Sequence, residues 1–341
     1  MNGNRRQRWL VGAFCLFLGT TALLYLLLPK KTFSPWERRQ LAALPASWDV
    51  TEWEAYFADH LPLRQFFLGV GAYAELLSGQ LEAGEIICRQ GYLTEAPLRW
   101  QETKVEENIA YVNQFTKSLA IPVDLMVVPS AGYCMQLRQD YADGDYIHRI
   151  HELSAATPVE VNLEGEGLFY RTDHHWTSRG AYAACAQYFA ALDRDLPPTE
   201  AFAVEEIPGF RGTTYARSCL WLTPAESIEL WHGSELQRTD GGPIFDRQAL
   251  AGEDKYSVFL GGNHPLTTLT NPRGQGHLVV VRDSYGSCLA PFLAEGYGKV
   301  TLVDLRYYKK PVSQLCEDAD RVLVVYCLNN FMSDPNFSFL Q

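Results

Sequence analysis

The sequence predicts an α/β fold built on a parallel sheet and preceded by a membrane-spanning helix. Nearly continuous runs of Val, Leu and other apolar residues occur at 122–129, 277–282, 299–305 and 321–326, which is typical of strands buried on both faces. Helical patterns separate several of these runs, and helices that alternate with buried strands indicate an α/β protein. A 20-residue segment at 9–28 carries no charge and accounts for the predicted membrane helix.

The uncharged segment is long enough to cross a bilayer. As a helix it would span about 30 Å, the thickness of the hydrocarbon core. Three Arg residues precede it, Lys30 and Lys31 follow it, and no small-residue cleavage motif comes after it. We therefore predict that residues 1–31 form a cytoplasmic tail and an uncleaved signal anchor. The N-terminus is expected inside the cell membrane and the chain from about residue 32 outside it.

Composition and charge exclude several classes of protein. An apolar fraction of 47% and a charged fraction of 20% in 341 residues indicate a globular chain. The net charge is −11, and residues 1–31 contribute five positive charges and no acid, so the remainder is more acidic still. An acidic ectodomain argues against binding of nucleic acid, which requires a basic surface. The eight Cys show neither a CxxC pair nor metal-ligand spacing, which predicts no disulfide framework.

Residues 32–100 are predicted to form a stalk followed by helices and a hairpin. A short helix is expected at 37–42. Apolar residues recur at helical spacing over 52–80, and Pro62 is expected to separate two helices there. The segment 86–93 is typical of a hairpin.

Residues 101–341 are predicted to form the α/β domain. An amphipathic helix at 104–119 precedes the first buried strand, and a strand-like segment lies at 159–163. A further helix at 178–192 has Ser178 as its expected cap. Residues 200–276 are richer in Gly, Pro and polar residues, so we interpret them as an insertion or as long active-site loops, with a turn at Gly241 and Gly242.

Two short runs supply the parts of an activated serine. Residues 172–177 read TDHHWT and residues 282–286 read RDSYG, so together they offer an acid, an imidazole and a hydroxyl. Because Asp173 and His175 are spaced by two, both can lie on one side of an extended segment. Asp173 would then hold the tautomer of His175, which accepts the proton of Ser284. His174 would face elsewhere and remains a rival base.

The predicted strand ends place further polar groups beside Ser284. Ligands in open α/β sheets bind beyond the carboxyl ends of the strands, and Ser284 follows one such strand. The backbone N–H groups of Ser284 and Gly286 are candidates for an oxyanion hole, together with the side-chain amide of Asn329 or Asn330. Arg306 follows another strand on this edge, where it would contact substrate or form a structural ion pair.

Each of these features also has an ordinary structural interpretation. A Ser after a strand is usually a helix cap. Asp173, His174 and His175 are of metal-ligating types, but adjacent residues of an extended segment point to opposite faces, so we predict no metal and no cofactor. Trp176 is expected to brace the loop by packing.

The motifs carry a resemblance to a known family. The runs at 172–177 and 282–286, with 304–308 and the N-terminal segments 37–45 and 56–64, resemble the DHHW family of bacterial proteins. That family is related to SGNH-hydrolase-like proteins of alginate O-acetylation. The resemblance implies a three-layer, flavodoxin-like SGNH-hydrolase fold in circularly permuted order, with Ser284 as nucleophile, His175 as base and Asp173 as its orienter. It also implies Asn329 as the source of the oxyanion-hole amide. Arg282 stands where the relatives have the Gly of a Gly-Asp-Ser run.

The function expected from these features is a membrane-anchored, extracellular serine O-acyltransferase or esterase. It would act on acyl groups, acetyl above all, of a cell-surface polysaccharide in the cell envelope. The resemblance also implies a multi-pass membrane acyltransferase as a partner that delivers the acyl group. Two alternatives remain open: a non-catalytic glycan-binding or assembly module that retains the fold, and a metal-dependent hydrolase built on residues 173–175.

Overall fold

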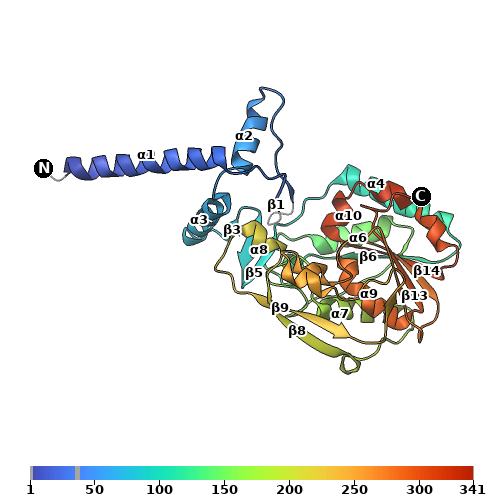
Figure 1. Ribbon diagram of the computed structural model, residues 1–341. Coiled ribbons are helices and arrows are strands. Elements are labelled where there is room, and N and C mark those ends of the chain that lie inside the picture. Colours follow the sequence, from blue (N-terminus) through green and yellow to red (C-terminus); the bar gives the residue numbers. More distant parts are fainter. Residues whose placement is uncertain (1–2, 35–38, 341) are drawn as a thin grey trace. The chain divides into compact units, whose positions relative to one another are not determined.

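The computed structural model describes residues 3–34 and 39–340. The chain divides into two compact units (Figure 1). The smaller comprises the chain up to Gly84 together with Ala216–Leu222, and the larger comprises Glu85–Tyr215 and the chain from Thr223 onward. The predicted boundary at residue 100 differs from this division. The hairpin of β4 (Ile86–Arg89) and β5 (Tyr92–Glu95) lies in the larger unit, where the N–H of Leu93 donates to the carbonyl of Arg171 at 2.8 Å.

The smaller unit contains the apolar helix α1 (Gly3–Leu27). Its segment Arg5–Leu27 is long and apolar enough to cross a membrane, with a mean hydropathy of 2.2. The most apolar part of this segment is not buried against the rest of the protein. The other elements are β1 (Phe33–Ser34), β2 (Arg39–Gln40), α2 (Val50–Asp59), α3 (Arg64–Leu77) and β3 (Glu82–Ala83). Pro62 separates α2 from α3, as predicted.

One prediction in this unit is wrong where the structure describes it. A helix was expected at 37–42, but Arg39 and Gln40 form β2, which pairs antiparallel with β1. Residues 37 and 38 lie outside the described residues. Local helical propensity is overridden here because the β1–β2 pairing satisfies the backbone hydrogen bonds of the segment.

A seven-stranded sheet forms the centre of the larger unit, in the order β10-β11-β13-β12-β14-β6-β7. Strands β13, β12, β14, β6 and β7 run parallel, and β11 and β10 join antiparallel at one edge. The bounds are β6 (Val123–Val128), β7 (Thr157–Pro158), β10 (Gln237–Arg238), β11 (Leu266–Thr270), β12 (His277–Arg282), β13 (Lys299–Val303) and β14 (Arg321–Cys327). Every residue of β6 and β12 is buried, which confirms the interpretation of the apolar runs.

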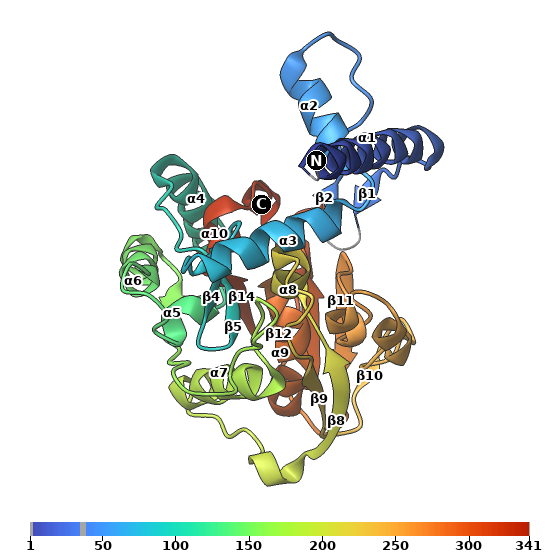
Figure 2. The ribbon, with the colours of Figure 1, turned by 90° about the vertical axis from the view of Figure 1, so that its left-hand side faces the viewer.

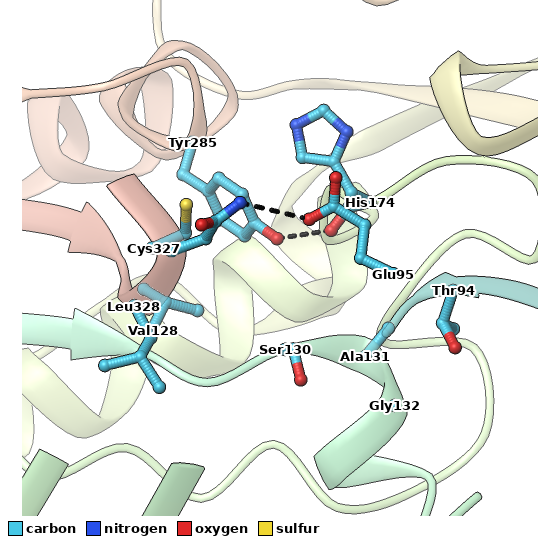
Figure 3. Close-up of a pocket in the computed structure, with 11 residues that line it drawn as sticks. Thr94, Glu95, Val128, Ser130, Ala131, Gly132, His174, Tyr285, Cys327 and Leu328 are labelled. Atoms are coloured by element: carbon cyan, nitrogen blue, oxygen red, sulfur yellow. Dashed lines mark hydrogen bonds between the residues drawn. The ribbon is translucent and has the colours of Figure 1, made fainter. Parts of the chain in front are cut away.

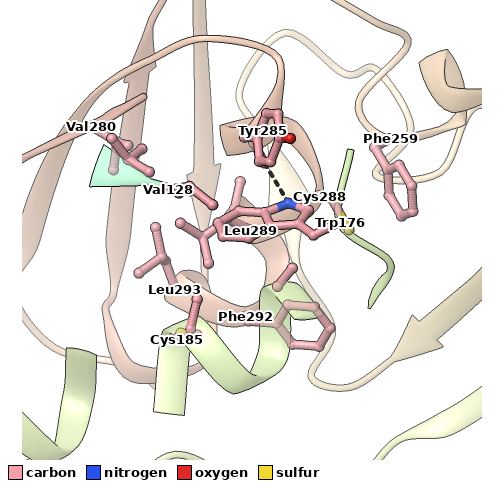
Figure 4. Close-up of a cluster of buried hydrophobic side chains, with 14 of the residues drawn as sticks. Val128, Trp176, Cys185, Phe259, Val280, Tyr285, Cys288, Leu289, Phe292 and Leu293 are labelled. Atoms are coloured by element: carbon pink, nitrogen blue, oxygen red, sulfur yellow. Dashed lines mark hydrogen bonds between the residues drawn. The ribbon is translucent and has the colours of Figure 1, made fainter. Parts of the chain in front are cut away.

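Helices cover both faces of this sheet (Figure 2). On one face the core includes side chains of α7 (Ser178–Ala191) and α9 (Tyr285–Gly296), and on the other it includes those of α4 (Glu102–Ser118), α6 (Asp143–Leu153) and α10 (Leu328–Ser333). Successive residues of β12 alternate between the cores: Val280 packs in the first and Val281 in the second. Figure 4 shows Val280, Tyr285 and Trp176 in the first core. The three-layer arrangement follows from this alternation.

Residues 200–276 contain more regular structure than the predicted loops. Strand β11 pairs with β13 and so extends the central sheet, while β8 (Ala203–Phe210) and β9 (Glu226–His232) form a separate antiparallel pair. The expected turn is present, with Gly241 at φ +75°. The remaining short elements are α5 (Ala131–Cys134), α8 (Thr213–Ser218) and the 3₁₀ turns Thr199–Ala201, Arg247–Ala251, Lys255–Val258, Val312–Cys316 and Phe337–Leu340.

Two local predictions need correction. The strand expected at 159–163 is wrong, because no residue of that range lies in a strand; the short strand β7 precedes it and pairs with β6 through only two residues, Thr157 and Pro158. The helix α7 is capped by Thr177, whose Oγ1 accepts from the N–H of Gly180 at 3.2 Å. Ser178 lies inside the helix instead, where its hydroxyl donates to the carbonyl of Glu229 at 2.6 Å.

Close packing at Gly180 gives the first testable prediction. A Cβ at this position would lie 2.1 Å from the carbonyl oxygen of Leu168, which accepts the N–H of Thr177 and cannot move freely. Gly180→Ala is expected to lower the free energy of unfolding by about 1–3 kcal/mol, measured by urea denaturation. Gly71→Ala is the matched control, since nothing lies within 4 Å of its added Cβ. Equal stability of the two variants would contradict the prediction.

Candidate active site

Ser284 lies where β12 gives way to α9. The preceding residue, Asp283, is fully buried and holds this junction together. Its carboxylate accepts from the backbone N–H of Tyr285 at 2.9 Å, from the N–H of Cys327 at 2.9 Å and from the amide of Asn330 at 2.8 Å. One buried charge therefore ties the end of β12 to the end of β14 and to the first turn of α9. Ser284 is fixed at the carboxyl edge of the sheet as a result.

The structure brings the acid, the imidazole and the hydroxyl into one relay. Ser284 Oγ lies 2.7 Å from His175 Nε2, although the two residues are 109 positions apart. His175 Nδ1 donates to Asp173 Oδ1, and the backbone N–H of His175 donates to the same oxygen at 2.9 Å. Because a carboxylate can only accept, this arrangement places a proton on Nδ1 and leaves Nε2 to accept the hydroxyl of Ser284.

Asp173 is fully buried, and its second oxygen is held by Thr213. The N–H of Thr213 donates to Asp173 Oδ2 at 2.6 Å and its hydroxyl donates at 2.9 Å. Burial by itself raises the pKa of this carboxyl group. The neighbouring imidazoles of His175 and His174 and the hydrogen bonds from His175 and Thr213 outweigh burial, and they hold the pKa of Asp173 well below its usual value. The acid of the relay is therefore ionised at neutral pH.

The loop that carries these residues is braced by aromatic packing. Trp176 is fully buried, and its Nε1–H donates to the carbonyl of Tyr285 at 3.2 Å (Figure 4). Tyr285 in turn donates its hydroxyl to the carbonyl of His174. Two bonds thus connect the 172–177 segment to the first residue of α9. They explain how the base is kept beside the serine.

The candidate oxyanion donors are in different situations. Among the described residues no acceptor is present for the backbone N–H of Ser284, whereas that of Gly286 donates to the carbonyl of Asp283 at 3.2 Å. An added Cβ at Gly286 would lie 2.6 Å from Cβ of Arg282, so this glycine also makes room for the buried arginine. The amide of Asn329 donates to Glu95 Oε2 at 3.4 Å, and that of Asn330 to Asp283.

A small cavity of about 30 Å³ lies beside the relay (Figure 3). His174 and Tyr285 line it together with Glu95 and Asn329. The remaining lining residues come largely from the ends of β5, β6 and β14: Thr94, Val128, Ser130, Ala131, Gly132, Cys327 and Leu328. Asn329 is thereby distinguished from Asn330, since only Asn329 is among the lining residues.

His174 and Arg306 occupy positions beside the relay rather than within it. The hydroxyl of Thr213 donates its only proton to Asp173. The hydroxyl oxygen therefore acts as the acceptor for His174 Nδ1, at 2.6 Å. Arg306 donates through Nε and Nη2 to the fully buried Asp304, at 2.9 and 2.7 Å. The structure therefore places Arg306 in an ion pair, the structural alternative considered for it.

Ligand atoms of Asp173, His174 and His175 lie within 4.8 Å of one another, which is close enough to consider a metal ion. The lone pairs of Asp173 and His175 are, however, directed at protein donors. Both oxygens of Asp173 accept hydrogen bonds, and Nε2 of His175 accepts from Ser284. A cation would have to displace these bonds, so the arrangement favours proton transfer over metal binding.

Three residues of the site were not singled out from the sequence. Thr213 holds Asp173, and Tyr256 stacks on His175 with ring centroids 3.8 Å apart. Glu226 accepts from the backbone N–H groups of Arg171 and Thr172 at 2.9 and 2.8 Å and so supports the catalytic turn. All three belong to the 200–276 segment. Their position in a segment that we interpreted as an insertion or active-site loops was the only sequence signal for a role in the site, because no local pattern links them to residue 173 or 175.

Ionisation of Asp173 gives a prediction for stability against pH. Its folded-state pKa is lowered, so the carboxylate contributes stability that is present above the unfolded-state value near 3.8 and is lost as the pH falls from there. Below about pH 4, the unfolding free energy of the wild type should fall more steeply than that of Asp173→Asn, by up to about 1.4 kcal/mol per pH unit. Urea titrations at several pH values measure this. The exposed Asp195→Asn should keep the wild-type slope, and the same slope for Asp173→Asn would refute the prediction.

Comparison with known proteins supports the fold. No protein-family model and no curated protein matches the sequence. Among solved structures, a DHHW family protein from Eubacterium siraeum superposes with a TM-score of 0.66 at 21% identity, over 74% of this chain and 93% of that one. Bacillus cereus PatB1 gives 0.59 at 17% identity, over 74% and 99% of the two chains. PatB1 with a sulfonyl adduct gives 0.58 at 16%, over 75% and 97%. This chain has the α/β, SGNH-hydrolase-like fold of these proteins, as its motifs led us to expect.

Proposed function

We propose that this chain is a membrane-anchored, extracellular serine O-acyltransferase or esterase that acts on acetyl groups of a cell-surface polysaccharide. The observation that carries the proposal is the relay of Ser284, His175 and Asp173, with 2.7 Å between Ser284 Oγ and His175 Nε2. An ionised acid, an imidazole of defined tautomer and a hydroxyl in this order are the parts of a nucleophilic serine.

In the proposed reaction Ser284 Oγ attacks the carbonyl carbon of an acyl ester. His175 Nε2 takes the hydroxyl proton, and ionised Asp173 stabilises the imidazolium that results. The backbone N–H of Ser284 would donate to the developing oxyanion. Collapse of the tetrahedral intermediate expels the leaving alcohol, which receives its proton from His175. The acyl group is then passed to a sugar hydroxyl or to water, which His175 deprotonates in turn.

The setting of this reaction rests on two further features. Helix α1 supplies a segment apolar enough to anchor the chain in a membrane. The sequence resembles the DHHW family, and the relation of that family to proteins of alginate O-acetylation supports acetyl as the acyl group, a surface polysaccharide as the acceptor and a multi-pass membrane acyltransferase as the partner that delivers the donor. The acidic ectodomain does not oppose a neutral glycan.

Replacement of the nucleophile tests the proposal directly. Ser284→Ala in the full-length protein is expected to lower hydrolysis of an aryl acetate by roughly 10³-fold or more and to abolish labelling by a sulfonyl fluoride. Ser287→Ala, at a buried serine one turn further along α9, should retain both activities. Full esterase activity of Ser284→Ala would rule out the assignment.

One observation favours a non-catalytic alternative. One N–H of the Asn329 amide donates to Glu95 and the N–H of Gly286 donates to Asp283, so two of the three expected oxyanion groups already have acceptors within the protein. A glycan-binding or assembly module would bind wall polymer, with no labelling of the wild-type Ser284. That combination of results would favour the alternative over the enzyme.

The two histidines separate the serine relay from a metal site. His175→Ala is expected to lower kcat by roughly 10³-fold or more because no base remains for Ser284. His174→Ala should lower kcat far less than His175→Ala, since His174 donates to Thr213 and packs on the ring of His175 but does not contact Ser284. A strong chelator such as EDTA should leave the wild-type rate unchanged. Loss of activity on chelation, restored by added zinc, would instead support the metal-dependent hydrolase.

A further inference from the structure

The ring of Tyr256 lies face to face on the imidazole of His175. The ring centroids are 3.8 Å apart and the planes differ by only 9°. His174 lies at 3.9 Å with a tilt of 35°, and Tyr285 at 5.0 Å with a tilt of 48°. Since two rings cannot occupy one face at such separations, His175 is held between Tyr256 and His174. Of these contacts, only that of Tyr256 is parallel.

The neighbours of Tyr256 fix its ring. Tyr256 is 4% exposed and belongs to the 3₁₀ turn Lys255–Val258. It packs edge to face against Phe259 at 5.1 Å and against Tyr170 at 6.3 Å. A side chain confined in this way presents one fixed surface, so the contact with His175 does not depend on a mobile loop.

We propose that Tyr256 is a positioning residue for His175, which keeps the imidazole in the plane of the relay and stabilises its protonated form. The inference rests on the proposed serine chemistry and extends it to a residue of the 200–276 segment. The hydrogen bonds to Asp173 and Ser284 lie in the plane of the imidazole and resist in-plane movement. The stacked phenol ring resists movement out of that plane.

The stacked ring also acts differently on the two charge states of His175. During attack by Ser284 the imidazole becomes a cation, and the face of an aromatic ring attracts a cation more strongly than a neutral group. The interaction is therefore stronger in the transition state than in the free enzyme. Such an interaction raises kcat and leaves KM nearly unchanged.

Two variants at Tyr256 test the proposal in the full-length protein. Tyr256→Phe keeps the ring and should retain kcat within about twofold. Tyr256→Leu removes it and should lower kcat on an aryl acetate by about 5- to 30-fold, with KM within about twofold. The rate at which a sulfonyl fluoride labels Ser284 should fall by the same factor, because that reaction also requires proton transfer to His175.

A matched variant separates positioning from packing. Phe189→Leu removes a buried ring of the same hydrophobic core, where Phe189 contacts Tyr188 and Tyr297 rather than His175. It should lower the melting temperature as Tyr256→Leu does, with kcat unchanged. Equal loss of kcat in Phe189→Leu and Tyr256→Leu would overturn the inference, as would failure of Tyr256→Phe to restore the rate.

Failure of the proposed function itself is distinguishable. If the wild type neither hydrolyses esters nor labels at Ser284, the serine chemistry is refuted, and the positions of the ring protons of His175 in NMR spectra still test the contact. Tyr256→Leu should shift these resonances by removing the ring current of the phenol, and Tyr256→Phe should preserve them. Unchanged resonances in Tyr256→Leu would overturn the positioning role.

Discussion

The active-site architecture depends on one buried charge, the carboxylate of Asp173. A fully buried anion is stable only when its oxygens are hydrogen-bonded and a positive or polar partner lies close. Asp173 obtains these partners from its own loop through His175 and from a distant segment through Thr213. The same contacts that make the charge tolerable define the tautomer of His175 and join the 200–276 segment to the catalytic loop. The same hydrogen bonds therefore stabilise the fold and prepare His175 to accept the proton of Ser284.

A second buried carboxylate plays the corresponding part at the sheet. Asp283 joins the ends of β12 and β14, which are neighbours in the sheet although 38 residues (283–320) lie between the last residue of β12 and the first of β14. Because parallel strands end at the same edge, the serine, the candidate amide of Asn329 and the cavity are brought together by topology. Arg282 then fills the space beneath Gly286, where an added side chain would collide with it.

The 200–276 segment is part of the site rather than an appendage to it. Thr213 holds the acid, Tyr256 covers the base, and Glu226 accepts from the backbone N–H groups of the two residues just before the acid. Each of these residues contacts the segment 171–175, and no sequence pattern predicts these contacts. The Gly, Pro and polar content of the 200–276 segment correctly indicated much irregular structure. It did not indicate the pairing of β11 with β13, because that sheet edge is supplied by residues further along the chain.

The sequence by itself determined the class of fold and the identity of the reacting groups. Short apolar runs rich in Val are typical of central strands buried on both faces, and TDHHWT and RDSYG contain the acid, the imidazole and the hydroxyl. Only the tertiary structure decided which groups meet: His175 rather than His174 faces Ser284, Asn329 rather than Asn330 lines the cavity, and Thr177 rather than Ser178 caps α7. Adjacent residues of one type have the same local preferences. The choice between them is made by long-range contacts that local periodicity does not encode.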